Sequence, residues 1–149
     1  KVGITRVSQG ITRWIDQGAS QAICLAEVPN RRLSGDIEVI LKKYVNDITN
    51  WRKMLSSEPD RLNLKEIKKD MIKKIPNEYQ KYIYEDDSIT NIYFPILKYP
   101  HKIKSLKLEK NNLIEGKING IKGQYIFLDS DRVFNIRSHE GFIVNIDFN

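Results

Sequence analysis

The first nineteen residues constrain the fold of this chain more than any other stretch. In residues 1–6, apolar side chains alternate with small or polar ones, which is the period-two pattern of a strand. A turn-forming stretch follows, and residues 13–17 fit a short helix that Gly18 can end in the left-handed conformation. A strand that passes through a tight turn into a helix would hold Thr5 close to Arg13.

The following stretch alternates between strand and helix patterns. Residues 19–28 form an apolar run that Pro29 ends, so we expect a buried strand there. From 33 to 48 the apolar residues recur at spacings of three and four, which predicts an amphipathic helix capped by Asn30 or Ser34. Two further helices are expected, at 50–55 and at 61–75.

The helix expected at 61–75 combines an apolar stripe with many lysines. Leu64, Ile67, Met71 and Ile75 form the stripe, and the lysines occupy the other faces: Lys65, Lys68, Lys69, Lys73 and Lys74. A membrane surface or nucleic acid could attract such lysines. The interspersed acidic residues favour the alternative, an ordinary solvated face.

The second half of the chain lacks the long helical periodicity of the first half. Residues 76–101 are rich in tyrosine and lack periodicity, so we interpret them as a linker. Residues 102–149 contain four or five short strand patterns separated by Gly and Asp turns, which predicts a small antiparallel β-barrel-like module. Its last strand, at 142–148, shows strict alternation, and Gly120 and Gly123 bracket a hairpin or bulge. The fold class expected for the chain is α+β.

The charge of the chain is a weak guide to its partners. The formal net charge is +6, which suggests nucleic acid. However, the excess is spread evenly along the chain, which favours an ordinary solvated surface over a nucleic-acid partner. No apolar run has the length of a membrane span, and the single cysteine, Cys24, lies in an apolar stretch, so we expect a cytoplasmic protein. The start at Lys1, without Met, leads us to expect a piece of a longer protein.

Several common sites are excluded by the residues present. One cysteine and two distant histidines match no zinc spacing, and there is no P-loop or dinucleotide fingerprint. The remaining constellation, in the first half of the chain, consists of Gly3, Thr5, Arg13, Glu38 and Asn50.

The order of elements around this constellation resembles the GIY-YIG nuclease superfamily. Residues 1–5 resemble its second triplet, Arg13 falls at the position of its helix arginine, Glu38 at its glutamate, and Asn50 at its trailing asparagine. Lys1 stands where the superfamily has the tyrosine of that triplet, and the sequence contains no first triplet. The resemblance implies that residues 1–75 are a GIY-YIG-like module lacking its first strand.

The resemblance also implies roles for the site residues. Glu38 would hold one Mg²⁺ ion by carboxylate oxygens, and Arg13 would clamp phosphate oxygens. Thr5 and Arg6 would add phosphate contacts, with Gly3 and Asn50 supporting the site. The alternative is a structural salt bridge between Arg13 and Glu38 that holds two helices together.

The whole chain also resembles an uncharacterised bacterial family. Its marks are KVGITR at 1–6, RWIDQGA at 13–19, TNWRKML at 49–55 and GIKGQY at 120–125. Its members look longer, with a Cys-rich part upstream, and the resemblance implies no established activity. Three functions stay open: a metal-dependent phosphodiesterase acting on DNA or RNA, a non-catalytic nucleic-acid-binding module, and a protein-interaction module.

Overall fold

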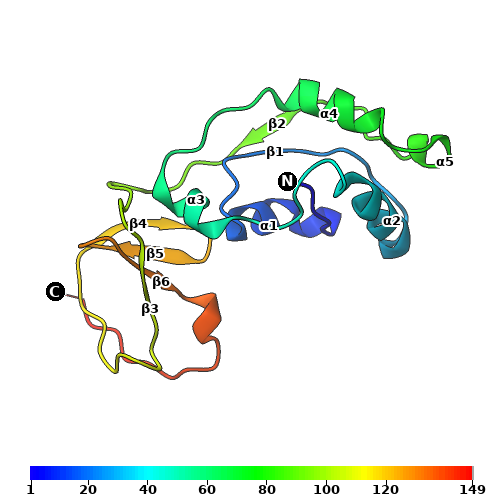
Figure 1. The fold of residues 1–149 in the computed structure, drawn as a ribbon. Helices are drawn as coiled ribbons and strands as arrows, with labels where there is room; N and C mark the ends of the chain where they lie inside the picture. The colour runs from blue at the N-terminus through cyan, green and yellow to red at the C-terminus, as the bar shows by residue number, and fades with distance from the viewer. Residues whose placement is uncertain (149) are drawn as a thin grey trace.

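The computed structural model of the chain describes residues 1–148 and confirms the α+β class (Figure 1). The α-helices are α1 (Gly10–Asp16), α2 (Arg31–Leu41), α3 (Trp51–Ser56), α4 (Leu64–Ile72) and α5 (Asn77–Gln80). The strands are β1 (Gln21–Ile23), β2 (Ile89–Asn91), β3 (Lys104–Leu106), β4 (Ile118–Lys122), β5 (Tyr125–Leu128) and β6 (Arg132–Asn135). Two 3₁₀ turns complete the set, at Val7–Gln9 and Arg137–His139. None of the helices in the described chain is long and apolar enough to cross a bilayer.

The N-terminal segment differs from the predicted strand. Residues 1–6 pair with no strand in the described chain. A backbone hydrogen bond from Val2 N to Asn46 O at 2.9 Å joins them to the segment after α2. The segment has no strand partner among residues 1–148, but its apolar Val2 side chain packs against the core that includes Ile37 and Leu41 of α2. The helix that follows begins earlier than predicted, at Gly10, and Gly18 has the expected left-handed conformation with φ +66°.

Helix α2 begins where predicted but is shorter than predicted. Asn30 caps α2 by accepting a hydrogen bond from Leu33 N at 3.0 Å, so the Asn30 alternative is confirmed. The helix ends at Leu41 rather than at 48. Its buried face, Ile37 and Leu41, forms the first core together with Ile75.

The first sheet takes one of its two strands from the predicted linker. Strand β1 pairs antiparallel with β2, with Gln21 opposite Asn91. Helix α5 also lies within 76–101. A three-residue strand is too short for periodicity to reveal it in the sequence.

The second sheet has the order β3-β6-β5-β4 and is mixed, since β3 runs parallel to β6. It does not close into a barrel, so the barrel prediction is wrong. Residues 142–148 form no strand, and their apolar side chains are exposed; residue 149 of the predicted module lies outside the described residues. Without a fifth paired strand, β3 and β4 remain the sheet edges.

Strands β4 and β5 form a hairpin, as predicted, and the structure shows why glycine is suited to positions 120 and 123. Gly123 has φ +59°, a conformation that favours glycine. A Cβ atom on Gly120 would lie 2.9 Å from Ile96 Cα, so glycine there permits the segment around Ile96 to lie against β4.

A second core joins α3 to this sheet. Leu55 from α3 is buried against Phe127 and Val133. Trp51 stacks on Tyr125 with ring centroids 5.7 Å apart and nearly parallel planes. Helix α3 is therefore held against the face of the second sheet.

Candidate nucleic-acid interface

Arg13 and Glu38 lie in a common group of charges at the start of the chain. Arg13 is exposed on α1 and Glu38 is half-buried on α2. Burial lowers the pKa of the Lys1 ammonium, and the positive charge of Arg13 lowers it further, while Asp47 and Glu38 oppose the shift. These side chains therefore share one electrostatic environment. Within residues 1–148 no ion pair joins Arg13 to Glu38.

The other residues predicted for phosphate contacts are exposed beside α1. The Thr5 hydroxyl donates to the carbonyl of Arg6 at 3.2 Å, and that carbonyl also accepts from Gln9 N. A Cβ atom on Gly3 would meet nothing within 4 Å, so packing does not require glycine there. No hydrogen bond links Thr5 to Arg13 in the described chain.

Asn50 has a structural role of its own at the start of α3. Its side chain caps α3 by accepting a hydrogen bond from Lys53 N at 3.0 Å. It also borders a hollow of about 470 Å³, which Arg13 and Glu38 do not line. Asn50 therefore has a local structural role that was not predicted from the sequence.

This hollow, called the cationic hollow below, brings basic side chains together from two distant segments. Its lining residues are Asn50, Arg52, Lys53, Ser56, His101, Lys102 and Ile103. No Asp or Glu of the described residues is among them. Sequence reasoning missed the hollow because the two segments, 50–56 and 101–103, are far apart in the chain. One part of the hollow does have a sequence signal, since residues 50–55 belong to the family mark TNWRKML at 49–55.

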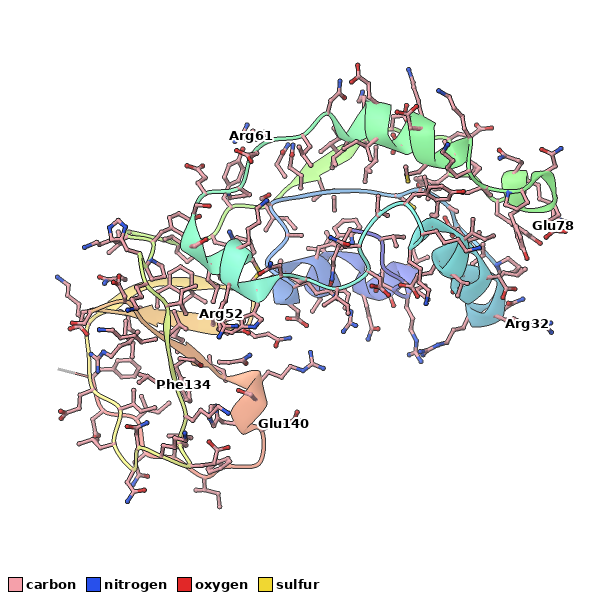
Figure 2. All side chains as sticks on the ribbon, viewed as in Figure 1. Arg32, Arg52, Arg61, Glu78, Phe134 and Glu140 are labelled. Carbon is pink, nitrogen blue, oxygen red and sulfur yellow. The ribbon has the colours of Figure 1, made fainter. Side chains whose placement is uncertain are left out.

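Arg52 is held in a defined position at the hollow. Arg52 lies on α3, where Figure 2 labels it. Its guanidinium carbon lies 4.3 Å from the centroid of the Trp51 ring, and Trp51 in turn stacks on Tyr125. A guanidinium held on an aromatic face keeps its N–H donors available for an oxyanion and loses less entropy on binding. The geometry therefore suits the capture of phosphate groups.

The residues available for a metal ion are few. The part of the chain that the structure describes contains no group of three or more His, Cys, Asp or Glu side chains arranged to hold one. A Mg²⁺ ion at Glu38 would therefore need oxygen ligands from water and substrate, which Mg²⁺ accepts readily. Asp47 is the second carboxylate of the same charge group.

The fold and the hollow define an α+β protein with a concave, cation-lined surface. Comparison with known families assigns residues 1–144 to a family described as protein of unknown function (DUF2797), and the chain belongs to that family. No curated protein matches the chain, and no solved structure does. The resemblance to GIY-YIG nucleases therefore stays a prediction.

Proposed function

We propose that this protein binds nucleic acid through phosphate contacts in the cationic hollow. The observation that carries the proposal is the convergence of Arg52, Lys53 and Lys102 on one concave surface. When lysine and arginine side chains neutralise phosphates, the nucleic acid releases its bound counterions. This release supplies most of the sequence-independent affinity. The net charge of +6 adds a favourable long-range field.

The proposal predicts a salt-dependent affinity that depends on two side chains. In the double variant Arg52→Gln, Lys102→Gln, binding of a labelled single-stranded oligonucleotide should weaken at low salt. The slope of log K against log salt should also become shallower by roughly 1.4, because two phosphate contacts are lost. Fluorescence anisotropy titrations at several salt concentrations measure both quantities.

A matched control separates the hollow from the overall charge. The double variant Lys43→Gln, Lys110→Gln removes the same two charges at exposed positions that do not line the hollow. It should bind nearly as well as wild type. Equal losses in the two double variants would show that binding follows net charge and would refute the hollow as the site.

A second candidate function, a metal-dependent phosphodiesterase, is favoured by the charge group around Lys1. Arg13 and Glu38 share that group without closing an ion pair in the described chain, so both remain available to a ligand. In this proposal Arg13, with Thr5 and Arg6, binds phosphate oxygens. Glu38 holds Mg²⁺, which when bound supplies stabilisation of negative charge at the scissile phosphate.

This second candidate predicts opposite effects of two substitutions. Arg13→Ala should weaken oligonucleotide binding by about 1.5–3 kcal/mol, the range for a hydrogen bond to a charged group. Glu38→Ala should leave binding unchanged or tighter, because it removes repulsion with phosphate, while any Mg²⁺-dependent cleavage disappears. Anisotropy and a gel-based cleavage assay give the two readouts. If both variants unfold earlier and bind like wild type, the two residues serve stability and the nuclease proposal fails.

A further inference from the structure

Beside the cationic hollow lies a second, smaller cavity of about 90 Å³. Three aromatic rings line it, those of Tyr93, Phe94 and Tyr99, together with the ammonium group of Lys122. Gln21 and Asn91 also line it, and their amides are joined by a hydrogen bond from Gln21 Nε2 to Asn91 Oδ1 at 3.3 Å. We call it the aromatic cavity. Its volume is below the roughly 300–1,000 Å³ typical of pockets for drug-sized ligands, which limits an occupant to about one ring system.

One of the residues that line the aromatic cavity, Lys122, is a buried lysine. The residue is 1% exposed, and its Nζ atom donates to Met54 O at 3.0 Å. The same atom lies 5.4 Å from the ring centroid of Tyr99 and 5.9 Å from that of Phe94. An ammonium group has three N–H donors, and Met54 O is the one hydrogen-bond acceptor that the described residues offer it. Burial lowers the pKa of Lys122, opposed by the charge of Glu58. A polar group entering the cavity would therefore find an unused donor.

Tyr93 forms an exposed but oriented rim. Its side chain is among the exposed aromatic residues, at 75%. Arg61, labelled in Figure 2, donates from Nη2 to the Tyr93 hydroxyl at 3.3 Å, and its guanidinium carbon lies 5.8 Å from the centroid of the Tyr93 ring. An exposed ring held by a neighbouring guanidinium can serve as a stacking platform.

The aromatic cavity and the cationic hollow lie side by side along the same two segments. Ser56 lines the hollow and Glu58 the cavity, at the end of α3. Only Pro100 separates Tyr99 in the cavity from His101 in the hollow. A phosphate bound in the hollow would therefore place an adjoining nucleotide next to the cavity.

We infer that the aromatic cavity receives one unstacked base of a single-stranded nucleic acid whose phosphates occupy the cationic hollow. This inference rests on the proposed nucleic-acid binding. The base stacks on Tyr93, and one of its carbonyl oxygens or ring nitrogens accepts a hydrogen bond from Lys122. The Gln21 amide accepts from Leu62 N at 3.1 Å and donates to Asn91 Oδ1 at 3.3 Å, so it helps to fix the wall beside the base. In a duplex the bases remain paired and stacked, so single strands are the preferred substrate class.

The test compares two twelve-nucleotide strands that carry the same phosphates. One is a thymidine strand, and the other is built from abasic tetrahydrofuran residues and offers no base. Wild-type protein should bind the thymidine strand about 5- to 150-fold more tightly, the range for losing one stacked base. Tyr93→Leu should remove most of this preference without changing the affinity for the abasic strand. Tyr44→Leu, at another exposed tyrosine, should keep the preference.

The outcomes separate this inference from the proposal on which it rests. Equal, salt-dependent affinity of wild type for both strands would overturn the base cavity and leave phosphate binding in the hollow intact. A Tyr93→Leu variant that weakens both strands equally would also overturn it. If neither strand binds at low salt, both the inference and the proposed function fail. Lys122→Met, with a melting curve to verify folding, should reduce the preference as Tyr93→Leu does.

Discussion

Replacing Lys68 with methionine is expected to lower the free energy of unfolding by about 2–4 kcal/mol, because a buried ammonium group and its hydrogen bonds are lost. Lys68 lies on α4 and is only 3% exposed. Its Nζ atom donates to Tyr84 O at 2.6 Å and to Asp86 O at 2.9 Å, and it pairs with an Asp87 carboxylate oxygen at 2.9 Å. Methionine fills a similar volume but provides no donor, so both carbonyls lose their charged partner.

A matched control is available one residue away. Lys69→Met removes the same charge at an exposed position of the same helix and should change stability by less than about 0.5 kcal/mol. Urea denaturation of both variants measures the difference. A Lys68→Met variant as stable as Lys69→Met would show that the loop at 84–87 does not depend on this ammonium.

The effect of Lys68→Met should also depend on pH. The hydrogen bond from Lys68 lowers the pKa of the Asp87 carboxyl, against a smaller opposing effect of burial. A carboxyl with a lowered pKa in the folded state stabilises the fold above its unfolded pKa of about 4, and this stabilisation is lost as pH falls through the folded value. The stability difference between wild type and the variant should therefore shrink in acid.

Lys68 also shows what a sequence pattern can and cannot reveal. The lysines of this helix were all predicted to face solvent, and for Lys68 that is wrong. Positions 64, 68, 71 and 75 follow helical spacing, so Lys68 falls on the apolar stripe, and that signal was present in the sequence. Its acceptors come from residues 84–87, and nothing local to the helix indicates them.

The sheets illustrate the same limit. The helices that depend on local caps and periodicity, α2 and α3, were predicted at nearly correct starts. Strand pairing depends on partners distant in sequence. Alternation at 142–148 predicted a strand, but no neighbour pairs with it in the described chain. Conversely, the sequence of β2 shows no strand periodicity, yet these residues form a strand by pairing with β1.

The candidate interface was predictable only in part. Arg13 and Glu38 were proposed from the order of elements and stay predictions, although both lie close enough to Lys1 for their charges to act on its pKa. The cationic hollow and the aromatic cavity arise because residues 91–103 pass beside α3 and β4. Sequence spacing contains no information on that approach. Asn50 has the local role of a helix cap, and its place in the predicted site stays a prediction.

Phe127 is a central side chain of the core that holds α3 against the second sheet. Phe127→Ala should lower the free energy of unfolding by about 3–5 kcal/mol, because it removes a buried ring and leaves a cavity. Phe127 is 1% exposed, packs with Leu55 of α3, and lies 6.1 Å from Tyr99 between ring centroids. Its loss therefore weakens the support of both the hollow and the aromatic cavity.

The control for this substitution is Phe148→Ala, which removes the same ring from a position that is 84% exposed and should cost less than about 0.5 kcal/mol. Phe127→Leu should fall between the two, because leucine refills most of the volume. Urea denaturation followed by tryptophan fluorescence suits the measurement, since Trp51 stacks on the same sheet and reports its separation from α3. If Phe127→Ala costs less than about 1 kcal/mol, α3 is not held by this core. The hollow and the cavity would then lack the rigid wall on which phosphate and base binding both depend.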